Sequence, residues 1–250
     1  MAISPPRRFC FTFASTHADG ASQPSIRLTG ALVAVILLAV AACGGATTAA
    51  IPPPTRTPVA TATPALLYQA DWSKGLAGWH ATAGWSIASG ALQSDTGDKR
   101  SVTIPYQPST SNYTVEFDLQ VVDIPRDGGY YMLTAAPSAS LSGYSAGIYS
   151  LRQPGVPRPN GDHPTISTLI VPQDAQDAST IANSVKDFEP GDSVRTYRVM
   201  VQANAALLYV DGRFYTSAES TQSPHLATGP LDIICGGVSI RITGLRIFSA

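Results

Sequence analysis

The chain has 250 residues and a formal net charge of −1, with 44% hydrophobic and only 13% charged residues. Three of the 16 basic residues and one of the 17 acidic residues lie before Cys43, so a chain that begins at Cys43 carries 13 basic and 16 acidic residues. This slightly acidic balance argues against a nucleic-acid partner, and the length allows one domain with a sizeable core.

Residues 28–42 form an uncharged apolar run that follows Arg27 and ends in small side chains. This order of a positive charge, a short apolar run and small residues is typical of a signal peptide. The run is shorter than the ~20 apolar residues that a helix needs to cross a bilayer. We therefore predict a signal peptide with a long leader over residues 1–42.

Val40-Ala41-Ala42-Cys43 resembles the bacterial lipobox. The resemblance implies that a signal peptidase cuts before Cys43 and that a diacylglyceryl thioether on its sulfur attaches the protein to membrane lipid at the cell surface. An ordinary signal peptide followed by an incidental cysteine is the alternative. Residues 43–65 are nearly all Gly, Ala, Thr and Pro, so we expect them to form a disordered, extended linker.

The remaining region, residues 66–250, has the side-chain pattern of an all-β domain. Residues 113–121 alternate between apolar and polar, which places five apolar side chains on one face of a strand. Further strands, separated by turns at Asn204-Ala205 and Asp211-Gly212, are predicted from shorter β-rich runs. These runs cover residues 197–202, 207–210, 213–215, 238–242 and 245–248. Thr243-Gly244 separates the last two.

The middle of the domain, residues 153–192, is rich in Pro, Asp, Gly and Ser. Its only firm strand candidate is residues 166–171. Long loops on β scaffolds often carry binding residues, and a surface insertion without function is the alternative.

Short motifs recur along the domain in a recognisable order: Asp71–Trp79, Gly84–Ile87, Gly90–Leu92, Tyr113–Val122, Gly143–Tyr149, Tyr209–Arg213 and Gly244–Ile247. This order resembles that of concanavalin A-like lectin and glucanase domains, which include the laminin-G-like and 3-keto-disaccharide hydrolase-like modules. The resemblance implies a jelly-roll sandwich of two antiparallel sheets, one of them concave. It fixes no ligand, because the fold serves many functions.

Retaining β-glucanases of that superfamily carry Glu-x-Asp-x-x-Glu on one strand as nucleophile, helper and acid, and Glu116 and Asp118 match the first two positions. Retention requires two carboxylates about 5 Å apart, and neither Gln120 nor Val121 can supply the second acid. We therefore predict no catalytic residue and favour a solvated strand face. Glu116 and Asp118 are kept as candidates for ligand binding.

Four tyrosines are the aromatic candidates for ligand binding, because rings on a concave sheet can stack against the apolar faces of sugars. They are Tyr130, Tyr131, Tyr144 and Tyr149. A position in the core, or a scattered surface position, is the alternative for each of them.

The sequence predicts no cofactor. The histidines after the linker lack the spacing of a zinc site: His80, His163 and His225. Asp71, Asp211 and Asp232 offer oxygen ligands for a structural calcium ion, with turn and capping roles as the alternative. Cys235 lies in an apolar run and is predicted to be a buried thiol.

These features together predict a lipid-anchored cell-surface module that binds carbohydrate or another extracellular polymer without catalysis. Two other functions stay open. One is glycoside cleavage of the 3-keto-disaccharide hydrolase-like kind, and the other is a structural or protein-binding role in the cell envelope.

Overall fold

The computed structural model describes residues 63–156, 163–173 and 181–250. The predicted signal peptide and Cys43 lie outside these residues. Within them the one helical element is η1, a single 3-10 turn at Trp72–Lys74, and all other regular structure is β-strand. No helix in the described part of the chain is long and apolar enough to span a membrane.

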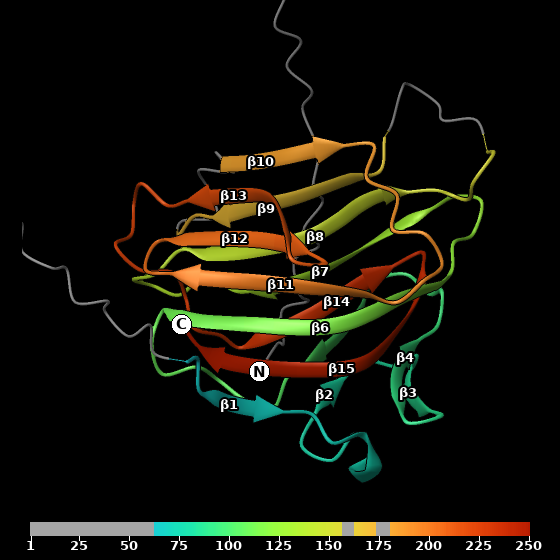
Figure 1. The fold of residues 1–250 in the computed structure, drawn as a ribbon, viewed down its shortest axis with the longest axis horizontal. Helices are drawn as coiled ribbons and strands as arrows, with labels where there is room; N and C mark the ends of the chain where they lie inside the picture. Colours follow the sequence, from blue (N-terminus) through green and yellow to red (C-terminus); the bar gives the residue numbers. More distant parts are fainter. Residues whose placement is uncertain (1–62, 157–162, 174–180) are drawn as a thin grey trace, which may run out of the picture. The chain divides into compact units, whose positions relative to one another are not determined.

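The strands form two antiparallel sheets (Figure 1). Sheet A has the order β13-β12-β11-β6-β15-β4-β3, and β1 also pairs with β15. Its strands are β1 (Leu66–Gln69), β3 (Trp85–Ala88), β4 (Ala91–Ser94), β6 (Asn112–Asp123), β11 (Arg195–Gln202), β12 (Ala205–Val210), β13 (Arg213–Glu219) and β15 (Ser239–Ser249).

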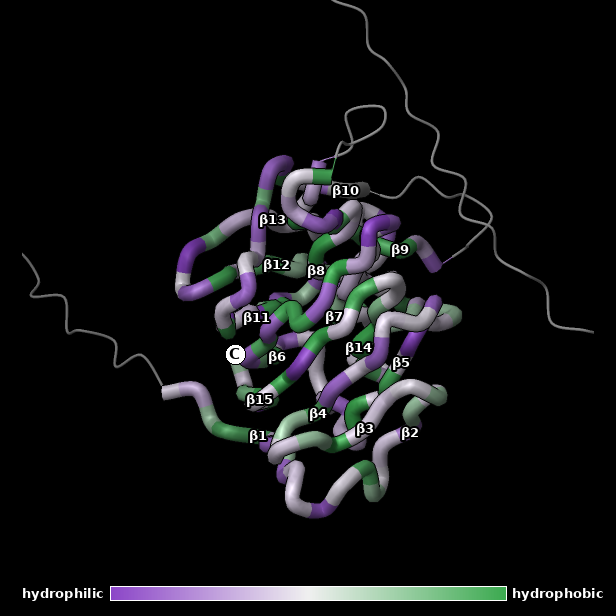
Figure 2. The backbone as a smooth tube through the Cα atoms, turned by 90° about the vertical axis from the view of Figure 1, so that its right-hand side faces the viewer, coloured by the Kyte–Doolittle hydropathy of each residue, from purple (hydrophilic) through white to green (hydrophobic). Residues whose placement is uncertain are grey.

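Sheet B has the order β10-β9-β8-β7-β14-β5-β2. Its strands are β2 (His80–Ala81), β5 (Arg100–Thr103), β7 (Gly129–Ala135), β8 (Gly143–Leu151), β9 (Thr165–Val171), β10 (Ile181–Lys186) and β14 (Leu231–Gly236). Figure 2 shows the two sheets as separate layers, with β11, β6 and β15 on one side and β7, β14 and β5 on the other.

Strand β6 shows why the chain forms a sandwich. Its alternating apolar side chains, from Tyr113 to Val121, are at most 5% exposed and face the core. The side chains between them, Glu116 and Asp118 among them, lie on the outer face, as alternation requires. The predicted strand and its buried face are therefore confirmed.

The hairpin of β12 and β13 is also confirmed. Its turn residues Asp211 and Gly212 have φ values of 50° and 77°, the left-handed conformation that an Asp-Gly turn favours. The preceding turn differs by one residue from the prediction. Ala203, with a φ of 51°, supplies the left-handed position, and Ala205 already belongs to β12.

Two predictions about strands are corrected. Residues 239–249 form one continuous strand, β15, and Thr243-Gly244 is a bulge in its pairing with β6 instead of a break between two strands. The middle of the domain contains β10 in addition to β9, and the two strands pair along Ile181–Lys186.

The core lies between the sheets and includes Trp72, Trp85 and the predicted buried thiol of Cys235, which is fully buried. At one side of the sandwich the edge strands of the two sheets meet. Thr216 of β13 donates a hydrogen bond of 2.8 Å to the Asn183 carbonyl of β10, and the Asn183 amide donates one of 2.5 Å to the Ser217 carbonyl. This junction of β10 and β13 positions the pocket described below.

Candidate functional site

The predicted carboxylates lie on the outer face of sheet A, where Glu116 is held between two arginines. Arg198 of β11 and Arg246 of β15 are its direct neighbours in the strand register on either side. The Arg198 guanidinium donates hydrogen bonds of 2.6 and 3.0 Å to Oε2, and Nη2 of Arg246 lies 2.9 Å from Oε1. Both oxygens of Glu116 are thus occupied by cations of adjacent strands.

Asp118 belongs to the same network. Its carboxylate accepts a hydrogen bond of 2.7 Å from the Thr196 hydroxyl and lies 3.3 Å from Nη2 of Arg246. The bulge in β15 places Gly244 opposite Asp118, and a Cβ at Gly244 would come within 2.6 Å of the carboxylate. The glycine therefore provides the space in which Asp118 turns toward Arg246. The two carboxylates form a network of ion pairs that connects three strands.

The four candidate tyrosines separate into two groups. Tyr131 and Tyr144 are 1% and 0% exposed and lie in the core, so neither ring has a face that a sugar could reach. Tyr130 and Tyr149 are half-buried on the outer side of sheet B. The Tyr130 ring lies against Gly236 of β14, and burial raises the pKa of its phenol. A stacking role is left only for Tyr130 and Tyr149.

The three aspartates that could have ligated calcium each have a structural partner. Asp71 caps the η1 turn by accepting from the Ser73 amide, and Asp232 accepts a hydrogen bond of 2.6 Å from Thr103. Asp211 accepts from the Thr196 amide. Among the described residues no three His, Cys, Asp or Glu side chains gather as metal ligands.

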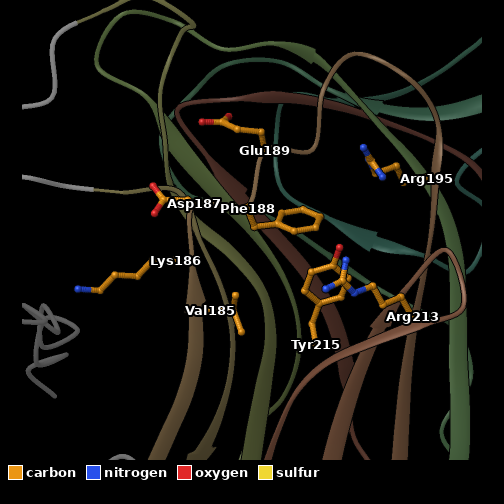
Figure 3. Close-up of a pocket in the computed structure, with 8 residues that line it drawn as sticks. All are labelled: Val185, Lys186, Asp187, Phe188, Glu189, Arg195, Arg213 and Tyr215. Atoms are coloured by element: carbon orange, nitrogen blue, oxygen red, sulfur yellow. The ribbon is translucent and has the colours of Figure 1, made fainter.

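A pocket of about 370 Å³ opens where β10 and β13 meet. Its lining comes from the end of β10, the segment that follows it, and the first residues of β11 and β13 (Figure 3). The lining residues are Val185, Lys186, Asp187, Phe188, Glu189, Arg195, Arg213 and Tyr215. A volume of this size lies within the range of small-ligand sites.

Two aromatic rings and Val185 form the apolar part of the pocket. Phe188 is 7% exposed and meets the half-buried Tyr215 edge to face, with 5.0 Å between the ring centroids. The pairing of β12 with β13 shifts by one residue at Leu208/Tyr209, which leaves Tyr215 as the extra residue of a bulge. A bulge re-aims a side chain, and here it accompanies a ring that faces the pocket instead of the outer surface of the sheet.

Two guanidinium groups lie beside these rings. Arg213 is exposed and its guanidinium carbon lies 5.2 Å from the Tyr215 ring centroid. The corresponding distance from Arg195 to the Phe188 ring is 6.0 Å. Arg195 is fixed by hydrogen bonds of 2.5 Å to the Pro190 carbonyl and 2.8 Å to the Asp211 carboxylate.

The two carboxylates that line the pocket, those of Asp187 and Glu189, are turned away from its aromatic rings. Oδ1 of Asp187 lies 2.5 Å from Nδ1 of His163. In Figure 3 the side chains of Lys186, Asp187 and Glu189 point away from the Phe188–Tyr215 pair, whereas Arg213 lies over the Tyr215 ring. Arg213 and the half-buried Tyr215 ring are therefore the groups that a molecule in the pocket would meet first, and the buried Phe188 ring supports Tyr215 from the core.

No protein-family model and no curated protein sequence matches the chain. Several solved structures match it at the level of the fold. A carbohydrate-binding module from Bacillus subtilis is 15% identical, with a TM-score of 0.50 over 69% of this chain and 96% of the module. An endo-β-1,3-glucanase from Pyrococcus furiosus is 10% identical, with a TM-score of 0.51 over 74% of this chain and 94% of the glucanase. A laminarinase from Rhodothermus marinus is 7% identical, with a TM-score of 0.53 over 75% of this chain and 98% of the laminarinase. The domain is a jelly-roll sandwich.

None of the six side chains predicted to bind ligand lines the pocket of this jelly-roll sandwich. The sequence does carry two signals for the pocket. The segment 153–192 has the composition of a candidate binding loop, and its last part supplies Lys186 to Glu189. The Asp211-Gly212 turn places Arg213 and Tyr215 directly after it.

Proposed function

We propose that the protein is a cell-surface lipoprotein whose jelly-roll domain binds carbohydrate without cleaving it. The observation that carries the proposal is the pocket in which the half-buried Tyr215 ring, supported by the buried Phe188 ring, lies beside Arg213. Aromatic rings contact the apolar C–H faces of sugars, and a guanidinium group donates hydrogen bonds to sugar oxygens. The similarity to a carbohydrate-binding module supports the same function at the level of the fold.

The carboxylate network supports binding over cleavage. Retaining glycosidases need one carboxylate free to attack and another free to donate a proton. Glu116 and Asp118 instead accept hydrogen bonds from arginines and from Thr196 on neighbouring strands. The described strands of sheet B carry one acidic residue, Asp232. Its carboxylate accepts a hydrogen bond from the Thr103 hydroxyl.

The lipid anchor is the second part of the proposal. The lipobox-like sequence at Val40–Cys43 supports attachment to a membrane, and the linker predicted over residues 43–65 would lift the domain from the lipid surface. A binding module held in this way would keep a polymer close to the cell.

The binding proposal is tested by retention on immobilised polysaccharides, with the full chain purified in detergent. We expect retention on at least one polymer and a clear loss in Tyr215→Ala. Phe214→Ala is the matched control, because Phe214 is the adjacent ring, is 48% exposed and contacts Tyr209 on the outer face of sheet A. No retention on any polymer, or an equal loss in both variants, would contradict the proposal.

Glycoside cleavage is the second candidate function, and it is favoured by the fold shared with glucanases. It predicts that the full chain releases reducing sugars from a polysaccharide that it retains. It also predicts that Glu116→Gln abolishes this release without changing retention. Retention without release of sugar supports the binding module.

A further inference from the structure

The pocket at the junction of β10 and β13 has an electrostatic character that narrows the class of ligand. We propose that it recognises an acidic polysaccharide and that Arg213 binds the carboxylate or sulfate group of one sugar unit. This inference rests on the proposed carbohydrate binding and adds to it the chemical class of the ligand.

The Arg213 side chain is oriented by an aromatic ring. Its guanidinium lies over the Tyr215 ring, and such a contact orients the planar group through the ring electrons without using its N–H donors. No ion pair or hydrogen bond of the Arg213 side chain is found among the described residues, and the residue is exposed. Arg213 thus presents an oriented set of N–H donors at the mouth of the pocket. A planar fork of this kind matches a carboxylate or sulfate in a two-point contact.

Arg195 differs from Arg213 in the use of its N–H donors. Its guanidinium lies near the other ring, but its donors are used by the Pro190 carbonyl and the Asp211 carboxylate. Arg195 therefore helps to build the wall of the pocket, and Arg213 is the guanidinium free to bind.

The negative charges near the pocket are paired or turned away from the rings. Asp187 is bonded to His163, and Asp211 is bonded to Arg195 and to the Thr196 amide. Glu189 points away from the rings in Figure 3. Asp187 and Glu189 therefore lie away from the Tyr215 ring, and Asp211 is engaged by Arg195 and the Thr196 amide, which reduces their competition with an incoming anion for Arg213.

The aromatic surface of the pocket indicates that the ligand also has an apolar face. An anionic group alone needs no apolar surface, and an oriented guanidinium forms stronger hydrogen bonds with an anion than with the neutral hydroxyl groups of a sugar. A sugar unit that carries an acidic group offers both an apolar C–H face for the accessible part of Tyr215 and an anion for Arg213.

The test uses two matched pairs of polymers and the full chain in detergent at about 150 mM salt, where long-range attraction between exposed charges is largely screened. Polygalacturonate is compared with its methyl ester, and dextran sulfate is compared with dextran. We expect the acidic member of at least one pair to bind about tenfold or more tightly than the neutral member. The pair that shows the difference identifies the anion as carboxylate or sulfate.

Variants then assign the effect to Arg213. Arg213→Gln is expected to weaken binding of the acidic polymer by about tenfold or more. Arg213→Lys, which keeps the charge but loses the planar fork, is expected to recover only a small part of that loss. Lys99→Gln is the control, because it removes one exposed positive charge from a residue that does not line the pocket.

Each other outcome overturns the inference. Equal binding of both members of each pair, or an equal loss in Lys99→Gln and Arg213→Gln, would show that Arg213 recognises no anion. Retention of neutral polymers alone would overturn the acidic ligand and leave the proposed carbohydrate binding intact. Retention of no polymer at all would overturn both.

Discussion

The hydroxyl groups of Tyr131 and Tyr197 lie 2.6 Å apart in the core and connect the two sheets. Tyr131 belongs to β7 of sheet B and Tyr197 to β11 of sheet A, and each is 1% exposed. A second pair, Tyr113 and Tyr144, repeats the arrangement with 2.9 Å between the hydroxyls. Each pair satisfies two polar groups that would otherwise be buried without a partner.

Replacing Tyr131 by Phe is expected to destabilise the domain by about 1–3 kcal/mol, because the Tyr197 hydroxyl then remains buried with its partner gone. The double variant Tyr131→Phe/Tyr197→Phe should cost less than the sum of the two single variants, since it leaves no unpaired group. Denaturant unfolding measures these differences. Tyr209→Phe, on a half-buried residue of the outer face, is the control and should change stability little. Additive single variants would show that the two hydroxyls are energetically independent.

The buried tyrosines also predict a loss of stability at alkaline pH. Burial raises the pKa of Tyr113, Tyr131, Tyr144 and Tyr197 above the ordinary value near 10. Above pH 10 the unfolded chain releases these phenolic protons while the folded chain retains them, so ionisation favours unfolding and stability falls as pH rises. Their contribution is fully present below pH 10. Thermal midpoints measured between pH 8 and pH 11 should be flat at first and then decline steeply. A decline of the same size in Tyr131→Phe/Tyr197→Phe would count against this origin.

The ion-pair network predicts a structural role for Glu116. Glu116→Gln removes the charge that Arg198 and Arg246 share, and about 1–2 kcal/mol of stability should be lost. The figure is modest because the two arginine side chains are 47% and 39% exposed. We expect the thermal midpoint to fall by several degrees. Asp123→Asn, at the exposed end of the same strand, should leave the midpoint nearly unchanged. An unshifted midpoint in Glu116→Gln would mean that the network contributes nothing to stability.

The parts of the fold that follow from local pattern could be predicted from the sequence. Strand β6 alternates over nine residues, and the Asp211-Gly212 turn defines the hairpin of β12 and β13. Strand β10 has a weaker apolar pattern, and its pairing with β9 sets its register. Thr243-Gly244 has the composition of a turn, but the structure uses it as a bulge beside Asp118.

The candidate site could be predicted only in part, because its residues converge through long-range contacts. Lys186 to Glu189 and Arg213 to Tyr215 come together where the edges of the two sheets meet. The partners of Glu116 are likewise set by strand register, which brings Arg198 and Arg246 beside it from distant parts of the chain. Tyr131 and Tyr144 face the core because of the direction in which β7 and β8 alternate, and composition does not distinguish that direction from the opposite one.

The two cysteines that follow the apolar run provide a test of the lipid anchor with an internal control. Cys43→Ser removes the sulfur that would carry the diacylglyceryl group, so the variant should lose incorporation of labelled fatty acid and move from the detergent phase to the aqueous phase on Triton X-114 partition. Cys235 is buried in the core and offers no site for a lipid. Cys235→Ala should therefore keep both properties of the unmodified chain, at the cost of a small loss of stability for the vacated space. Fatty-acid labelling that persists in Cys43→Ser would exclude Cys43 as the anchor, and labelling absent from the unmodified chain would exclude the anchor itself.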